Sequence, residues 1–386
     1  MTGKTYTIPI RSLLGRRRRS FTLAELIVTI VIISILMGIT WGAILRVRQQ
    51  GRVAKTKATI AKINQIIMER YDSYRTRRVP VDTRGLPPLV AARFRLWAIR
   101  CIMAWEMPDQ WDEIDPSTGV VSSYTLEIEE NSQTYVRTIR APALWDTYRR
   151  FLARLNAQGV AQKIHSGQLS PMEANRYGRL LNAVLLYMIV CASDPQNREL
   201  FADSEIAWLP FPGLDQHGQD ITVKLPVFVD GWGNPIYFIR CPVGFPDSDI
   251  QVADPENHHD AFDPLRVDPN AYATFPLVVS PGPDGAIGLS FGSRAGYDAF
   301  GNKDFSANYY SLAVSRQWKA RVLPIEQLAA LGPAFRQYDW FNLNTIPGGN
   351  LSGAPYRATP LDDQEAEHYP NGHFDNIHNH RAETMP

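Results

Sequence analysis

Residues 16–45 read RRRRSFTLAELIVTIVIISILMGITWGAIL, and this stretch decides where the rest of the chain can lie. From Leu26 to Leu45 there are twenty residues and no charged side chain. A helix rises about 1.5 Å per residue, so this run is about 30 Å long, the thickness of the hydrocarbon core of a bilayer. The sequence therefore predicts a transmembrane helix that follows directly on four consecutive arginines.

Glu25 is a lone carboxylate at the start of the apolar run. A carboxylate near the bilayer centre costs about 2.5–3.5 kcal/mol, and it costs less at the interface, where it reaches water. Glu25 therefore either marks the interface or has a partner of opposite charge inside the membrane.

The block Ser20-Phe21-Thr22-Leu23-Ala24-Glu25 resembles the cleavage site of type IV prepilins and type II secretion pseudopilins. The resemblance implies that a prepilin peptidase cuts between Ser20 and Phe21 and methylates the new amine of Phe21. It also implies that Glu25 pairs with the N-terminus of a neighbouring subunit, because opposite charges attract strongly at low dielectric constant. Ser20 departs from the family, which usually has Gly there, so we expect cleavage to be tolerated or slower.

The orientation of the span follows from Arg16–Arg19, which the positive-inside rule keeps in the cytoplasm. Residues after Leu45 are then expected in the periplasm, with the chain crossing the inner membrane once. Two other interpretations of the N-terminus are weaker. A nucleic-acid or nuclear-import patch would not run into a long apolar span. A secretory signal has an apolar region of about 7–15 residues that ends in a small-residue cleavage site.

The balance of charge changes once residues 1–20 are set apart. The whole chain has a formal charge of +1, but residues 1–20 hold six basic residues and no acid, which leaves 34 basic against 39 acidic residues. No basic surface for nucleic acid is implied. The three cysteines, Cys101, Cys191 and Cys241, lack the spacing of a zinc site and allow at most one disulfide within the chain.

We predict an α+β fold in five segments. Residues 1–20 form a basic leader, and residues 21–79 form a transmembrane and amphipathic helix that ends near Arg75. Residues 80–225 form a mainly helical insertion, and residues 226–345 form a small antiparallel β head. Residues 346–386, rich in Gly, Pro and His, form a mobile tail. Within the insertion, helices are expected at 89–107, 143–155 and 171–191, with a hairpin at 120–140. The apolar stripe beyond the membrane consists of Val53, Thr56, Ile60, Ile63, Ile67, Tyr71 and Tyr74.

Two segments of the predicted head resemble the major pseudopilin of type II secretion. Asp230-Gly231-Trp232-Gly233-Asn234-Pro235 matches a D-x-W-G-N-P turn before a strand, and Gly282-Pro283-Asp284-Gly285 matches a G-x-D-G loop after a strand. That family binds calcium in this loop, so the resemblance implies a calcium site at Asp284. Asp298 and Asp304 lie downstream in a Gly-rich segment and are the expected carboxylates to complete it, although they do not align with the family pattern. In the other interpretation, Asp284 is a turn residue that accepts hydrogen bonds from its own backbone.

Two further patterns carry less weight. Residues 288–292 match the hydrolase elbow G-x-S-x-G, but that motif requires a following helix, which the Gly-rich sequence there does not predict. The tail histidines lack the spacing of a structural zinc site, and we expect a solvated tail, with loose metal binding as the other interpretation. These histidines are His368, His373, His378 and His380.

The chain is therefore predicted to be a structural, non-enzymatic subunit of pseudopilin type that assembles into a periplasmic filament for type II-like protein secretion. The expected partners are the prepilin peptidase, other pilin-like subunits and an inner-membrane secretion platform. One alternative is a single-pass membrane-anchored periplasmic binding protein or enzyme whose anchor only resembles a prepilin. Another is a minor, tip-capping pilin, because a head of over 300 residues is bulky for repeated packing.

Overall fold

The computed structural model describes residues 23–109, 111–114, 123–165, 168–242, 248–250, 257–267, 273–285, 287, 289, 321–322 and 376–381. The chain divides into two units, here named the N-terminal unit (Met1–Gly51) and the C-terminal unit (Arg52–Pro386). The fold is α+β, as predicted, with one long apolar helix, several shorter helices and small sheets.

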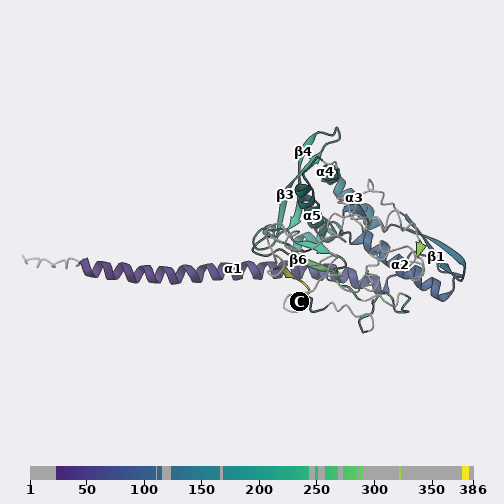
Figure 1. Ribbon diagram of the computed structural model, residues 1–386, viewed down its shortest axis with the longest axis horizontal. Coiled ribbons are helices and arrows are strands. Elements are labelled where there is room, and N and C mark those ends of the chain that lie inside the picture. The colour runs from purple at the N-terminus through teal and green to yellow at the C-terminus, as the bar shows by residue number, and fades with distance from the viewer. Residues whose placement is uncertain are drawn as a thin grey trace, which may run out of the picture. The chain divides into compact units, whose positions relative to one another are not determined.

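The long helix α1 runs from Leu23 to Thr76, beginning in the N-terminal unit and ending in the C-terminal unit (Figure 1). Its bounds confirm, within the described residues, the helix predicted to end near Arg75. Every large apolar side chain from Leu26 to Leu45 is exposed in this single chain. A helix that is apolar on all sides needs an apolar surrounding, either the core of a large protein or lipid.

Within the described residues, four further α-helices lie in the C-terminal unit: α2 (Pro88–Glu106), α3 (Ala143–Arg154), α4 (Ala157–His165) and α5 (Pro171–Tyr187). The predicted helices at 89–107, 143–155 and 171–191 are confirmed, whereas α4 was not predicted. A π-helical turn η3 (Met188–Ala192) continues α5. Short 3-10 turns are η1 (Trp111–Glu113), η4 (Pro195–Leu200) and η5 (Asp203–Glu205).

The start of α5 shows how local sequence fixes a helix boundary. Ser170 Oγ accepts a hydrogen bond from the backbone N–H of Glu173, and the Glu173 carboxylate accepts one from the Ser170 N–H at 3.1 Å. Pro171 occupies the first helical position, where a missing N–H does no harm. Ser170 and Pro171 therefore fix the residue at which α5 begins.

The strands of the described part of the chain form three small sheets. The hairpin β1 (Ser123–Glu130) and β2 (Gln133–Arg140) is antiparallel, and β7 (Arg321–Val322) pairs parallel with β1. The second sheet is the antiparallel pair β3 (Ile206–Leu214) and β4 (Asp220–Phe228), beside which α4 and α5 pack (Figure 1). In the third sheet, β6 (Leu277–Ser280) lies between β5 (Tyr237–Ile239) and β8 (Ile377–His378), with Val279 opposite both Tyr237 and His378.

Two parts of this topology differ from the sequence-based expectation. Most of the hairpin β3–β4 lies within residues 80–225, which were expected to be mainly helical. Strand β8 lies within the segment expected to be a mobile tail, and for residues 376–381 that expectation is wrong, because Asn376, His378 and Asn379 are buried in the sheet.

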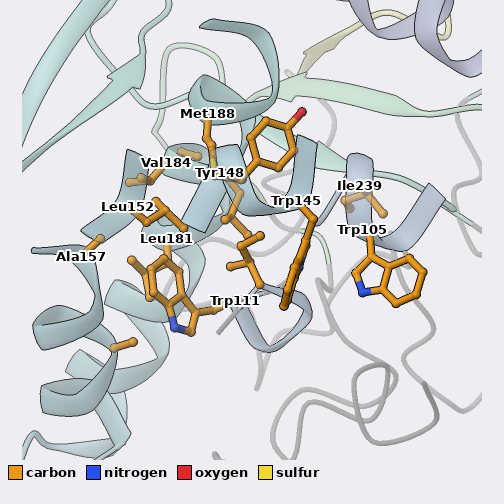
Figure 2. Close-up of a cluster of buried hydrophobic side chains, with 14 of the residues drawn as sticks. Trp105, Trp111, Trp145, Tyr148, Leu152, Ala157, Leu181, Val184, Met188 and Ile239 are labelled. Carbon is orange, nitrogen blue, oxygen red and sulfur yellow. The ribbon is translucent and has the colours of Figure 1, made fainter. Parts of the chain in front are cut away.

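The described residues of the C-terminal unit form two clusters of buried apolar side chains. In the first, Trp145 and Tyr148 of α3 lie among side chains of α2, α5 and β5 (Figure 2). The second cluster packs the outer part of α1 against α2, η3 and β6. The predicted apolar stripe of α1 is confirmed from Thr56 onward, since Thr56, Ile60, Ile63, Ile67, Tyr71 and Tyr74 are all buried. Among the described residues, Cys101, Cys191 and Cys241 are buried thiols that form no disulfide, and burial raises the pKa of Cys101 to about 12.

Candidate functional site

Glu25 lies in the first turn of α1, with its side chain exposed. It is the only carboxylate between Leu23 and Met68. The first turn of a helix carries free N–H groups and a partial positive charge, so a carboxylate is favoured there. Ser20 and Phe21, between which cleavage is predicted, lie outside the described residues.

The apolar span satisfies its own hydroxyl groups. Thr29, Ser34 and Thr40 each donate a hydrogen bond to the backbone carbonyl four residues earlier, at 2.7, 2.8 and 2.8 Å. They are the only hydroxyl-bearing residues from Leu26 to Leu45. Polar groups in hydrocarbon must find partners within the protein, and these bonds leave no hydroxyl of the span to seek water. Within the described residues, α1 is the one helix long and apolar enough to cross a membrane.

A second site lies in the C-terminal unit, in the turn Asp230–Pro235. Asp230 is buried, and its Oδ1 accepts hydrogen bonds from the backbone N–H groups of Trp232 and Asn234, both at 2.8 Å. Its Oδ2 accepts a hydrogen bond from Ser280 Oγ of β6 at 2.8 Å. These three bonds compensate the loss of water around the buried carboxylate. Asp230 thereby fixes the shape of the turn and ties it to the sheet.

The same turn rests directly on α1. The backbone N–H of Gly231 donates a hydrogen bond to Thr56 Oγ1 at 2.9 Å. A Cβ atom at Gly231 would lie 2.3 Å from the carbonyl oxygen of Arg52, closer than real contacts allow. Only glycine permits the turn and the helix to approach this closely.

The two segments that resemble the pseudopilin head lie in contact. Asn234 Nδ2 donates a hydrogen bond to the Gly282 carbonyl at 2.9 Å, and the Gly282 N–H donates one to Ser280 Oγ at 3.1 Å. Gly282 and Gly285 have φ of 72° and 75°, in the left-handed region that favours glycine. The structure thus joins the two motifs and α1 into one junction, here named the head–helix junction.

Glu205 reinforces the junction, and sequence analysis missed it. Its Oε1 accepts a hydrogen bond from Thr59 Oγ1 at 2.6 Å, and its Oε2 pairs with Lys62 Nζ at 3.0 Å. Burial acts to raise the pKa of Glu205, but the bonds from Thr59 and Lys62 outweigh it, so the pKa is lowered. Thr59 and Lys62 lie among many other polar residues of α1, so the sequence carried no specific signal for this contact.

At the end of α1, Glu106 of α2 plays a similar part. It accepts hydrogen bonds from Tyr74 Oη at 3.0 Å and from the Arg77 guanidinium at 2.7 Å. Burial, followed by the charge of Glu106, raises the pKa of Tyr74 well above its usual value. Tyr74 therefore stays a neutral hydrogen-bond donor. The outer part of α1 is held by polar contacts as well as by its apolar stripe.

Comparison with known protein families decides the nature of the N-terminus. Residues 15–41 match the family described as the prokaryotic N-terminal methylation motif. The chain carries a prepilin-type N-terminal methylation motif. This confirms the resemblance drawn from Ser20 to Glu25 and supports a type IV pilin-like precursor. A search of curated proteins and a search of solved structures each found no match to the chain.

The methylation motif covers the arginine run, the predicted cleavage site and most of the apolar span. It implies processing by a prepilin peptidase and pilin-like assembly. The exposed apolar helix that begins within the motif fits membrane anchoring. The C-terminal unit lies outside the motif.

The calcium site stays a prediction. Asp284 is exposed in the turn after β6, whereas Asp298 and Asp304 lie outside the described residues. Within the part of the chain that the structure describes, no group of three or more His, Cys, Asp or Glu side chains is placed to hold a metal ion. Residues 288 and 290–292 of the G-x-S-x-G pattern are likewise outside the described residues.

Two of the tail histidines are not solvated. His378 and His380 are buried, and the two ring nitrogens of His380 lie 2.9 Å from Ser248 Oγ and 3.1 Å from the Pro276 carbonyl oxygen. The expectation of a solvated tail fails here because this short segment completes the sheet next to β6. His368 and His373 lie outside the described residues.

Proposed function

We propose that this chain is a structural, pilin-like subunit that is made as a precursor, processed at its N-terminus and assembled into a filament. A prepilin peptidase would cut between Ser20 and Phe21 and methylate the amine of Phe21. Glu25 would then pair with that amine on a neighbouring subunit, which sets the register of assembly. The C-terminal unit, held to α1 at the head–helix junction, would form the outer part of the filament.

One observation carries this proposal: helix α1 begins within the methylation motif at residues 15–41, and its large apolar side chains from Leu26 to Leu45 are all exposed. Such a helix requires lipid before assembly and neighbouring helices after it. Both requirements are met when the subunit moves from a membrane into a filament. The satisfied hydroxyls of Thr29, Ser34 and Thr40 suit both surroundings.

We further propose that the filament serves type II-like protein secretion, with an inner-membrane platform as the assembly partner. The support is the resemblance of Asp230–Pro235 and Gly282–Gly285 to the major pseudopilin, together with the contact between these two segments. The span would cross the inner membrane once, with residues 1–20 in the cytoplasm and the C-terminal unit in the periplasm. The subunit would act mechanically, without catalysis of its own.

The N-terminus of the membrane-extracted protein tests the first step. Mass spectrometry of the N-terminal peptide should give N-methylated Phe21 in cells with a prepilin peptidase, and intact residues 1–20 in cells without it. If residues 1–20 persist with the peptidase present, or if the mature chain starts elsewhere, the chain is a membrane-anchored protein of another class.

Glu25→Ala tests assembly separately from processing. The variant should be cleaved and should reach the membrane, yet it should fail to enter sheared or crosslinked filaments. Glu69→Ala is a matched control, because Glu69 is another exposed glutamate on α1, far from the motif in sequence. Equal filament yields from the two variants would refute the role given to Glu25.

A further inference from the structure

The end of the apolar span carries one aromatic and two cationic side chains, all in the N-terminal unit. Trp41 is 67% exposed, and Arg46 and Arg48 are exposed directly after Leu45. The sequence has no carboxylate from Leu26 to Met68. Within the described residues, no acidic side chain pairs with either arginine. The charge at this end of the span is therefore not neutralised by the chain around it.

The position of the two arginines along the helix matches the headgroup layer of a bilayer. The hydrocarbon core is about 30 Å thick and the whole bilayer about 40–45 Å, which leaves roughly 5–7 Å of headgroups on each side. That layer corresponds to about four residues of helix. If the core ends at Leu45, Arg46 and Arg48 lie among the phosphates, and Trp41 lies about one turn inside the interface, where its ring is favoured.

Helix geometry also directs the two arginine side chains toward the bilayer. Each Cα–Cβ bond in a helix tilts toward the N-terminus, so side chains placed after the span lean back toward the bilayer. Because Arg46 and Arg48 are two residues apart, they point to nearly opposite sides of α1 and reach different lipids. A guanidinium donates two parallel hydrogen bonds to one phosphate group. Because no carboxylate surrounds the two arginines, their N–H groups stay available for this contact.

We propose that Arg46 and Arg48, here named the arginine collar, bind the phosphate groups of anionic phospholipids at this end of the span. This proposal rests on the membrane anchoring in the proposed function. It adds one chemical class of partner, a monoanionic phospholipid such as phosphatidylglycerol. It would hold the unassembled subunit at a fixed depth and surround the helix with anionic lipid. The competing partner for Arg46 and Arg48 is an acidic side chain on a second copy of this chain.

Trp41 provides the probe, because brominated acyl chains quench a tryptophan only on contact. The full chain is reconstituted in vesicles that contain brominated phosphatidylglycerol in plain phosphatidylcholine, or the reverse mixture, at the same mole fraction. Subtracting the signal of Trp41→Phe isolates Trp41 from the other tryptophans. Each arginine of the collar contacts its own lipid and contributes about 1 kcal/mol. The collar therefore predicts that phosphatidylglycerol binds beside the helix about fivefold more tightly than phosphatidylcholine.

Variants and salt decide whether the arginines are responsible. Arg46→Gln/Arg48→Gln should bring the ratio close to one, Arg46→Lys/Arg48→Lys should keep most of it, and high salt should lower it. In each sample, quenching by brominated phosphatidylcholine reports that the helix is still inserted.

A ratio of one for the natural sequence, or an unchanged ratio in the glutamine variant, would overturn the collar. So would salt-sensitive self-association of the subunit with equal quenching by both lipids, since it would assign the arginines to a second copy. If no brominated lipid quenches Trp41 at all, the membrane anchoring itself is wrong, and this outcome is distinct from equal quenching.

Discussion

The Asn379 side chain donates a hydrogen bond to Asn64 Oδ1 of α1 at 2.7 Å, although the two residues are 315 positions apart in the sequence. The same Nδ2 group donates to the Pro276 carbonyl at 2.9 Å, and Asn379 Oδ1 accepts from the Val278 N–H at 2.7 Å. One buried amide therefore joins the segment 376–381, strand β6 and the long helix. The C-terminal segment is a structural part of the C-terminal unit.

Asn379→Ala should destabilise the C-terminal unit by about 3 kcal/mol, because it leaves the Val278 N–H and the Asn64 amide buried without partners. Asn64→Ala removes a single bond and should cost about 1 kcal/mol, with a coupling energy in the double variant. Urea unfolding of the full chain in detergent, followed by tryptophan fluorescence, measures these values. Gln216→Ala, at an exposed site, is the control and should stay within about 0.5 kcal/mol. If Asn379→Ala lowered the free energy of unfolding no more than the control, the Asn379 amide would not be what joins the three segments.

Gly231→Ala tests the close approach at the head–helix junction. The added methyl group would meet the Arg52 carbonyl at 2.3 Å, so the turn and α1 must separate. We expect the free energy of unfolding to fall by about 1–3 kcal/mol. The backbone N–H at position 231, which donates to Thr56 Oγ1 in the natural sequence, should also exchange its hydrogen faster. Gly178→Ala is the matched control: Gly178 is in α5 with open space around it, so alanine should be neutral or slightly stabilising. Equal stability of both variants would show that the approach is not tight.

Much of this fold could be predicted because local signals agreed with the tertiary structure. The stripe of α1 repeats at helical spacing, and its members from Thr56 to Tyr74 are buried. The capping box at Ser170 and the prolines that start α2 and α5 act through neighbouring residues alone. Signals of this kind can be read without knowledge of distant contacts.

The parts that could not be predicted depend on distant partners. Strand β8 has only two residues, and it exists because β6 offers a free edge about a hundred positions earlier in the chain. Strand β3 contains Pro210 and Pro212, which argue against a central strand. Among the described strands it pairs only with β4, so it is an edge strand there. Glu205 could not be assigned to α1 from sequence because its partner Thr59 lies 146 residues away.

Arg240 is the centre of a buried charge cluster with Glu113 and Asp109. It is fully buried, and its guanidinium donates to Glu113 Oε1 at 2.6 Å and to Oε2 at 3.0 Å. Its backbone N–H donates to Asp109 Oδ2 at 2.6 Å. Burial acts to lower the pKa of Arg240, but the carboxylates of Glu113 and Asp109 outweigh it and raise the pKa. The guanidinium therefore stays charged and balances its partners.

Arg240→Met keeps much of the side-chain volume but leaves two buried carboxylates without their cation, so we expect a loss of about 3–5 kcal/mol. The double variant Arg240→Met/Glu113→Gln should recover part of this loss, since it removes one of the two charges. Arg150→Met, at an exposed site of α3, should change stability little. The same urea unfolding assay applies, and a double variant less stable than Arg240→Met would contradict the charge argument.

His380 should make the stability of the C-terminal unit depend on pH. Burial, with a smaller contribution from His378, lowers the pKa of His380 to about 4 in the folded chain. The unfolded chain, with an ordinary histidine pKa of about 6.5, binds the proton first, so acid stabilises the unfolded state. The contribution of His380 to stability is thus full above pH 6.5 and falls by about 3 kcal/mol as the pH drops to 4. The free energy of unfolding of the natural sequence and of His380→Gln should be measured across this pH range. The difference between the two values should shrink toward low pH. His217→Gln, at an exposed site, should run parallel to the natural sequence, and a parallel His380→Gln curve would show that His380 is protonated in the folded state.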